Sequence, residues 1–407
     1  MENKIQQLGL PNSFCFAPYT NLDLDQDGSF YPCYRSKVRQ GKWKDGKVVE
    51  AYNNESMQEL RDDLWHGREN DNCIQCHRRE SEGQRSTRQQ YNEDVLDNRI
   101  ESTEFVEEIK ANHLVARIED IHTMEVRPHG MCTNACAHCD ENSSSRWITL
   151  QDIDNTPFLE NYKDEPNVLD DLYNKATNLK AIHFTGGEPL LYEKTHLQHL
   201  QNIPNKETIE LRYHSSLKTL PGDDIREIWK TFGHVKIFVS LDTSEKFYAY
   251  FRWGSNWPTT IENIEAIRDI VEIQATITVN VLTMLDIIPL INYLVDNDIG
   301  MNASFVDPPH QLSCVYLPNN LKARACGELN QARFKVLQYA TPKHTRLATK
   351  WLAEIQEFMM SQDHGDSWPK DTVNMFRQLD HVYGLLIKNY DPELDFAVPV
   401  ENYVETE

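Results

Sequence analysis

The chain has 407 residues, 40% of them hydrophobic, which is enough for a large core and for two or three domains. No apolar run approaches the roughly 18–20 residues that a membrane-spanning helix needs, and the first residues lack the apolar core of a secretory signal. The formal net charge is −22, from 41 Lys and Arg against 63 Asp and Glu, which disfavours extended nucleic acid as a partner. We therefore expect a cytoplasmic protein that is not attached to a membrane.

The first predicted part, residues 1–92, holds four of the nine cysteines. It contains a turn-rich stretch, Asp25-Gln26-Asp27-Gly28, and one short helix that is predicted to begin after Asn54 and to stop at Gly67. The apolar residues of that helix fall on one face: Met57, Leu60 and Leu64. Residues 93–117 are charged and polar, and the pattern predicts a linker with some helix.

The second predicted part, residues 118–317, alternates short apolar runs with longer helical or loop stretches. Crossovers of roughly 20–55 residues between such runs are typical of repeated βα units with parallel strands. We therefore predict the α/β class, with a partial parallel (β/α)6 barrel that resembles a TIM barrel. The six predicted strands are 123–127, 181–185, 210–213, 235–241, 274–281 and 301–306.

The last part, residues 318–407, is predicted to be helical. Trp351, Ile355, Phe358 and Met359 would share one helical face, and Val373, Phe376 and Tyr383 would share another. We expect these helices to pack against the core and to carry no chemistry of their own.

Three cysteines with short spacing follow the first predicted strand of the barrel. They are Cys132, Cys136 and Cys139, separated by three and then two residues. A [4Fe–4S] cube takes four ligands, so three thiolates leave one iron open to coordinate another molecule. The alternative is a zinc ion with His129 or His138 as the fourth ligand. Structural zinc sites usually combine two separate cysteine pairs, so the spacing favours the iron–sulfur cluster.

The Cys132–Cys139 spacing resembles the signature of the radical S-adenosylmethionine (radical SAM) superfamily, and further motifs at strand ends carry the resemblance. The resemblance implies that Gly186-Gly187-Glu188 binds the amino group of the cofactor, that Ser240 and Asp242 approach its ribose, and that Arg252 meets its carboxylate. His138 is predicted to lie against the adenine, although relatives usually have a bulkier aromatic residue at this position. Ser216 would form part of the wall around the cofactor or substrate. The chain departs from the family in the fifth strand, which lacks the GxIxGxxE pattern.

The four N-terminal cysteines resemble a SPASM or twitch module, the auxiliary-cluster domain of this superfamily. The module would open with Cys15, Gly28 and Cys33, with twelve residues between the first two and four between the last two. Gly28 would close a hairpin. Cys73 and Cys76 supply a second pair. Further residues also resemble twitch proteins: Ser56, Leu60, Arg61, Gly67, Glu80, Gly83, Ser86 and Arg88. The resemblance implies one fully ligated auxiliary [4Fe–4S] cluster, with a four-cysteine zinc site as the alternative.

The resemblance implies reductive cleavage of S-adenosylmethionine to a 5′-deoxyadenosyl radical that abstracts hydrogen from a substrate. The substrate would be a peptide or protein, or a sugar- or nucleoside-like metabolite, and a flavodoxin or ferredoxin would supply electrons. The alternative function is a non-catalytic iron–sulfur or zinc protein that acts as a redox sensor or scaffold. Cys314 and Cys326 stand apart from both groups. They are ordinary cysteines or candidate catalytic thiols that donate or accept a hydrogen atom.

Overall fold

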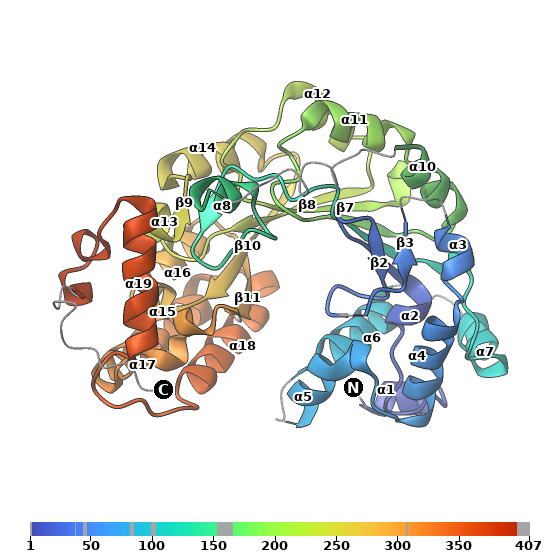
Figure 1. The fold of residues 1–407 in the computed structure, drawn as a ribbon, viewed down its shortest axis with the longest axis horizontal. Coiled ribbons are helices and arrows are strands. Elements are labelled where there is room, and N and C mark those ends of the chain that lie inside the picture. The colour runs from blue at the N-terminus through green and yellow to red at the C-terminus, as the bar shows by residue number, and fades with distance from the viewer. Residues whose placement is uncertain are drawn as a thin grey trace.

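The computed structural model describes residues 2–36, 38–43, 47–81, 85–98, 103–152, 166–306 and 308–396. Among these, nine strands form one sheet in the order β11-β10-β8-β7-β6-β4-β1-β2-β3. Figure 1 shows an arch with this sheet along its underside, the N-terminal helices below one end and the C-terminal helices below the other. Within the described ranges, no helix combines the length and apolar character that crossing a bilayer would require.

Six strands of the sheet are the predicted barrel strands, and each is parallel to its neighbours. They follow one another in chain order, which confirms the partial (β/α)6 barrel. Their bounds lie within two residues of the predicted runs. The strands are β4 (Thr123–Val126), β6 (Ala181–Phe184), β7 (Glu210–Ser215), β8 (His234–Ser240), β10 (Glu272–Val279) and β11 (Gly300–Phe305).

The alternation of side chains along these strands separates an apolar outer face from a polar inner face. In β10, for example, Ala275, Ile277 and Val279 are buried, whereas Gln274, Thr276 and Thr278 are half-buried. The apolar face packs against the barrel helices. These are α8 (Ser145–Leu150), α10 (Pro166–Lys175), α11 (Glu193–Asn202), α12 (Asp223–Trp229), α13 (Glu245–Phe251), α14 (Trp257–Ile267), α15 (Val281–Met284) and α16 (Ile287–Asp296).

The N-terminal part joins the same sheet rather than forming a sheet of its own. β1 (Asn21–Leu24) lies parallel to β4, with Asn21 opposite Thr123. β2 (Ser29–Tyr31) and β3 (Gly41–Lys42) extend the sheet in antiparallel fashion. The remaining N-terminal elements are α1 (Glu2–Gln7), α2 (Ala17–Thr20), α3 (Val48–Ala51), α4 (Glu55–His66), η1 (Asp71–Cys73), α5 (Ile74–Ser81), α6 (Thr87–Asn98), α7 (Thr103–Ala111) and η2 (Ile118–Asp120).

The helix predicted after Asn54 is α4, and its ends have the predicted chemistry. The Asn54 side chain accepts a hydrogen bond from the Met57 amide, which satisfies one free N–H of the first turn. Gly67 ends the helix in the left-handed region at φ +72°. Gly28, also in the left-handed region at φ +79°, closes the β1–β2 hairpin as predicted.

The C-terminal part is helical, as predicted. It consists of α17 (Asn319–Tyr339), α18 (Pro342–Met359) and α19 (Lys370–Tyr383), preceded by the short turns η4 (His310–Leu312) and η5 (Cys314–Tyr316). α17 packs on α16 and α18, and α18 covers the edge strand β11. The predicted domain boundaries at residues 92, 117 and 317 stay predictions. Residues 397–407 of the predicted tail lie outside the described residues.

Candidate functional site

The three barrel cysteines lie on one loop that a small second sheet holds in place. In that sheet β5 (Ala135–Cys136) pairs antiparallel with β9 (Arg252–Trp253), so that Cys136 is directly opposite Arg252. The Arg252 guanidinium donates a hydrogen bond to Cys136 Sγ at 3.5 Å. The thiols of Cys136 and Cys139 are in hydrogen-bond contact, and neither they nor Cys132 form a disulfide. The loop therefore gathers three free thiols.

The environment of these thiols favours a thiolate at the centre of the loop. A hydrogen bond from Cys139 lowers the pKa of Cys136, and the Arg252 charge acts in the same direction against burial. Burial instead raises the pKa of Cys132 to about 12. Since a thiolate is the form that binds a metal, the positive charge of Arg252 favours the ligand form of Cys136.

Gly186 and Gly187 allow the loop after β6 to pack directly on the backbone of the cysteine loop. The Gly187 amide donates to His129 O at 3.1 Å, and the Glu188 amide donates to Met131 O at 2.8 Å. A Cβ on Gly187 would lie 2.3 Å from Met131 O, and one on Gly186 would lie 2.6 Å from His129 O. The two glycines are therefore required by contact with the cysteine loop itself.

The Glu188 carboxylate ties this loop to the end of β7. It accepts hydrogen bonds from Ser215 Oγ at 2.8 Å, from Ser216 Oγ at 2.8 Å and from the Ser216 amide at 3.0 Å. Ser216 is thus bonded to Glu188, next to the cysteine loop. Glu188 also lines a cavity of about 320 Å³ together with Thr133 of the cysteine loop and Lys218.

Asp242 and Arg252 form a buried ion pair beside the cysteine loop. Arg252 Nε donates to Asp242 Oδ2 at 2.7 Å, and the Thr278 amide donates to Asp242 Oδ1 at 2.6 Å. Ser240, at the end of β8, contributes its carbonyl to the Tyr248 hydroxyl. Arg252 does not face bulk solvent, and its guanidinium is engaged by Asp242 and Cys136. The predicted contacts of these three residues with the cofactor stay predictions.

His138 is buried and stacks on Phe251, with ring centroids 5.2 Å apart. Burial lowers the pKa of His138 to about 4, so the ring is neutral near pH 7. Among the described residues, its Nδ1 has no hydrogen-bond partner. A flat neutral ring next to Cys139 is compatible with the predicted place beside an adenine.

The C-terminal helix α19 contacts the cysteine loop, which the sequence did not indicate. The Tyr383 hydroxyl donates to Ala135 O at 2.7 Å, and its ring stacks on Trp253 at a centroid distance of 5.6 Å. Trp147 of α8 donates from its indole N–H to Cys136 O at 3.0 Å. Aromatic side chains from three elements thus surround the loop and limit its access to water.

The four N-terminal cysteines come from three separate segments that the fold brings together. Cys15 precedes α2, Cys33 follows the β1–β2 hairpin, and Cys73 and Cys76 lie at the end of η1 and in α5. Burial raises the pKa of Cys15, and the nearby charges of the other three thiols add to this effect. All four are free cysteines.

Two arginines named by the twitch resemblance hold these segments. Arg61 is fully buried and donates to the carbonyls of Pro18 at 2.9 and 3.1 Å and of Tyr52 at 2.9 Å. Arg88 pairs with Glu80 and donates to Phe14 O at 3.0 Å, directly before Cys15. Through these contacts, Arg61 and Arg88 have a structural role: they hold together the segments around the four cysteines. Gly83 lies outside the described residues.

A cavity of about 840 Å³ lies along the inner face of the sheet. The barrel contributes Thr123, Glu125, Arg127, His183, Thr185, Gly186, Arg212, His214, Phe238, Thr276, Asn302 and Ser304. The N-terminal part contributes Asp25, Gln26, Tyr34, Arg35, Thr87, Gln90 and Tyr91, and the segment after Cys139 contributes Asn142 and Ser143. The cavity wall therefore includes residues next to both cysteine groups.

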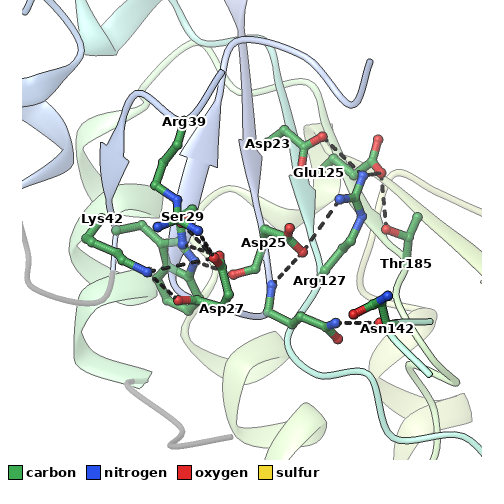
Figure 2. A network of polar contacts seen from close by, with 12 residues as sticks. Asp23, Asp25, Asp27, Ser29, Arg39, Lys42, Glu125, Arg127, Asn142 and Thr185 are labelled. Atoms are coloured by element: carbon green, nitrogen blue, oxygen red, sulfur yellow. Dashed lines mark hydrogen bonds and ion pairs between the residues drawn. The ribbon is translucent and has the colours of Figure 1, made fainter. Parts of the chain in front are cut away.

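Arg127 connects the N-terminal hairpin to the barrel at this cavity (Figure 2). Its guanidinium is 3.2 Å from Asp23 Oδ2, 3.1 Å from Glu125 Oε1 and 3.6 Å from Asp25 Oδ1. Thr185 donates to Glu125 at 3.1 Å, and Gln26 at the hairpin tip donates to Asn142 O at 2.8 Å. These contacts join β1, β4 and the segment that follows the cysteine loop.

The floor of the cavity is aromatic. The rings of His183 and His214 lie 4.8 Å apart, and Phe238 lies 5.0 Å from His214. Burial lowers the pKa of both histidines to about 3, so they are neutral near pH 7. Neutral imidazoles and the hydroxyl of Thr276 can donate or accept hydrogen bonds without adding charge.

The family models match both cysteine-bearing parts of the chain. Residues 126–294 match the Radical SAM superfamily, and residues 15–77 match SPASM, described as an iron–sulfur cluster-binding domain. The barrel therefore carries a radical SAM domain, and the N-terminal part carries a SPASM domain. The SPASM match precedes the barrel, as the resemblance of the N-terminal cysteines implied.

Several solved structures of radical SAM proteins are similar to this chain at low identity. Histidine-tagged anSMEcpe with bound AdoMet is 14% identical with a TM-score of 0.40, and the match covers 54% of this chain and 62% of that one. Streptococcus suis SuiB bound to S-adenosylmethionine is 12% identical with a TM-score of 0.40, covering 76% and 69%. The same SuiB bound to precursor peptide SuiA is 13% identical with a TM-score of 0.38, covering 76% and 68%.

This chain thus matches only 62% of the length of anSMEcpe. No curated protein matches it.

Cys314 and Cys326 lie apart from the large cavity. Cys314 is fully buried in η5, and Cys326 is half-buried on α17, with Lys322 close to both thiols. Burial raises the pKa of each, so both are thiols near pH 7. Neither lines the 840 Å³ cavity, and their predicted part in hydrogen-atom transfer stays a prediction.

Proposed function

We propose that this chain cleaves S-adenosylmethionine reductively at a [4Fe–4S] cluster and abstracts hydrogen from a substrate in the 840 Å³ cavity. One observation carries the proposal. A single cavity is lined by Gly186 of the glycine loop, by Asn142 after Cys139 and by Arg35 two residues after Cys33. A molecule in this cavity would lie between the two cysteine groups, where a radical formed at one and electrons exchanged at the other can both reach it.

The residues of the barrel loop fit a cluster with one open iron. Cys132, Cys136 and Cys139 are the ligands, and Arg252 stabilises the thiolate of Cys136. When bound, the cluster would supply the electron that splits the sulfonium of S-adenosylmethionine. Tyr383, Trp253 and Trp147 enclose the loop and exclude water from it.

For S-adenosylmethionine, the chain offers polar groups at strand ends beside this loop. The glycine loop presents backbone to the amino group, with Glu188 fixing its geometry through Ser215 and Ser216. Asp242 and Ser240 would meet the ribose, and His138 would lie against the adenine. Arg252 would meet the carboxylate while keeping its contact with Asp242.

We infer that Cys15, Cys33, Cys73 and Cys76 bind an auxiliary [4Fe–4S] cluster rather than zinc. Four sulfurs at about 2.3 Å from one zinc ion lie about 3.8 Å from each other. Among the described residues, which include all nine cysteines, no three cysteine sulfurs lie within 4.8 Å of one another. A cube holds its ligands farther apart because each cysteine binds a different iron. Four ligands leave no open iron, which suits electron transfer.

The cavity supports a polar substrate of limited size. Its volume is in the range of about 300–1,000 Å³ that holds a small molecule, and it would also hold a short peptide segment. Arg35 lines the cavity, and its guanidinium forms no ion pair with a carboxylate of the described residues. Arg35 can therefore bind an anionic group of the substrate. Electrons would come from a small reductant such as flavodoxin or ferredoxin.

The test is the formation of 5′-deoxyadenosine from S-adenosylmethionine by anaerobically reconstituted, dithionite-reduced protein. We expect formation in the wild type and none after joint replacement of Cys132, Cys136 and Cys139 by Ala. The double change Cys73→Ala and Cys76→Ala should remove about four irons and keep the cleavage. Cys326→Ser serves as the matched control, because it should keep both the iron content and the cleavage.

Two results would contradict these proposals. Iron-replete protein that forms no 5′-deoxyadenosine would favour the alternative function, a redox sensor or scaffold. Stoichiometric zinc that is lost with Cys73 and Cys76, with no loss of iron, would make the N-terminal site structural.

A further inference from the structure

Three side chains outside both cysteine groups converge on one point of the N-terminal surface. Asp62 and His66 lie one turn apart on α4, and His113 follows α7. Asp62 Oδ1 is 2.9 Å from His113 Nε2 and 3.2 Å from His66 Nδ1. The three ligand atoms lie within 4.8 Å of one another, and among the described residues no other group of this kind is found.

These separations match the edges of a metal coordination sphere. Nitrogen and oxygen ligands at about 2.1 Å from a zinc ion lie about 3.0 Å apart in octahedral geometry and about 3.4 Å apart in tetrahedral geometry. The two distances from Asp62 Oδ1, 2.9 and 3.2 Å, fall close to this range. A metal ion can therefore take the place of the hydrogen bond between His113 and Asp62. His66 Nδ1, which is also 2.9 Å from the Asp62 backbone O, would reach the ion with a small movement of its side chain.

Neighbouring residues fix the orientation of two of the three ligands. Arg68 pairs with the other oxygen of Asp62, Oδ2, so that Oδ1 is directed to the histidines. Trp65 stacks on His113 with ring centroids 4.7 Å apart and an interplanar angle of 13°. Partners that orient ligands in this way are typical of metal sites. The side chains are 50%, 34% and 22% exposed for His66, Asp62 and His113, which leaves room for water at the remaining positions.

We propose that Asp62, His66 and His113 bind one divalent transition-metal ion, with Zn²⁺ the preferred ion. Two imidazoles and one carboxylate suit zinc and its neighbours in the first row, whereas Mg²⁺ and Ca²⁺ prefer oxygen ligands alone. The ion joins α4 to the segment that leads into β4. It also fixes the packing next to Cys15, because Trp65 contacts Phe14 edge-on at 6.2 Å.

The experiment is calorimetric titration of Zn²⁺ into the cluster-loaded protein under anaerobic conditions, with iron measured before and after. We expect one site per chain, no loss of iron, and a thermal midpoint several degrees higher with excess Zn²⁺. His66→Ala and His113→Ala should each weaken binding about tenfold or more. Asp62→Asn provides a third variant that keeps the shape of the side chain.

The control is His234→Ala. His234 is 46% exposed and pairs with Glu272 at 3.0 Å, but this pair lacks a second histidine. Its replacement should leave Zn²⁺ binding unchanged. The proposal is overturned if wild type binds no Zn²⁺ at one equivalent, if the three ligand variants bind as wild type does, or if Zn²⁺ binds only with release of iron. None of these results depends on cleavage of S-adenosylmethionine.

Discussion

Gly187 lies where the loop after β6 touches the backbone before Cys132, and this contact leaves no room for a side chain. A Cβ there would be 2.3 Å from Met131 O and 2.7 Å from backbone carbons of the cysteine loop. Because backbone atoms cannot move aside as a flexible side chain can, any larger residue must displace the loop. The geometry of the three thiols therefore depends on this glycine.

We expect Gly187→Ala to reduce iron at the barrel cluster and to abolish most binding of S-adenosylmethionine. The cost should be that of overpacking, about 1–3 kcal/mol. Gly327→Ala is the matched control, since nothing lies within 4 Å of its Cβ position in α17 and the change should stabilise that helix by up to about 1 kcal/mol. Iron analysis, equilibrium dialysis of the cofactor and thermal unfolding distinguish the two variants. Normal iron and cofactor binding in the Gly187 variant would contradict this role.

At the residue scale, the sequence predicted groups that carry a motif and missed contacts between distant residues that carry none. Cys132, Cys136 and Cys139 lie within eight residues of sequence, so their proximity could be predicted from the sequence alone. Arg127 contacts Asp23, which is 104 positions away, and nothing in the local pattern of either residue indicates the other. Glu188 was expected at the cofactor, whereas its bonds to Ser215 and Ser216 depend on how β6 and β7 align.

Among the elements, α19 has a role that its amphipathic pattern did not indicate. The pattern predicted a packing helix, and Phe376 and Leu379 are buried as such a helix requires. Tyr383 continues that face and reaches Ala135 in the cysteine loop. A hydrophobic stripe shows that a helix packs against something, but it does not show which loop lies opposite.

We expect Tyr383→Phe to make the barrel cluster more labile while the helix stays folded. Removing the hydrogen bond to Ala135 O should cost about 1 kcal/mol, which allows the loop to open about five times more often. The measurement is the rate of loss of cluster absorbance in air. Tyr339→Phe is the control, because Tyr339 is 61% exposed on α17 and should leave the rate unchanged. Equal rates in both variants would show that α19 does not protect the cluster.

The strands of the barrel were predictable because apolar runs of suitable length alternate with helices. The partner of β1 was not, since a strand of four residues, Asn21–Leu24, carries too little pattern to specify its neighbour. The first 92 residues were therefore predicted as a domain of their own. In the structure their hairpin extends the barrel sheet through β4.

On the scale of the whole molecule, Arg127 holds this joint together. It is the cation that faces Asp23, Glu125 and Asp25, and the Asp23 side chain is fully buried. Burial and the nearby Glu125 charge raise the pKa of Asp23, while Arg127 acts to lower it. Without Arg127 the buried carboxylates would lose their counter-charge.

We expect Arg127→Met to destabilise the protein by about 3 kcal/mol, the lower end of the range for breaking a buried ion pair. Loss of the cation raises the folded pKa of Asp23 further above its unfolded value. The free energy of unfolding of the variant is therefore unaffected by Asp23 below the unfolded pKa of this residue, and it falls as the pH rises through the folded pKa of Asp23. The defect should consequently be larger at pH 8 than at pH 5. Thermal unfolding at both pH values measures it.

Arg39→Ala is the matched control for this prediction. Arg39 is 52% exposed and pairs with Asp27 on the same hairpin, so its loss should cost less than about 1 kcal/mol at either pH. A defect in the Arg127 variant that is no larger than in the Arg39 variant would show that the joint does not depend on this cation.

The pairing of β1 with β4 also sets an order of events during synthesis. The ribosome synthesises residues 21–24 long before residues 123–126. The hairpin that contains β1 therefore stays without its parallel partner β4 while the rest of the N-terminal part is synthesised. Contacts between such distant segments form late because closing the long intervening loop is entropically costly. The joint between the N-terminal hairpin and the barrel sheet is thus completed only after the first barrel strand has left the ribosome, which ties the final packing of the N-terminal part to translation of the barrel.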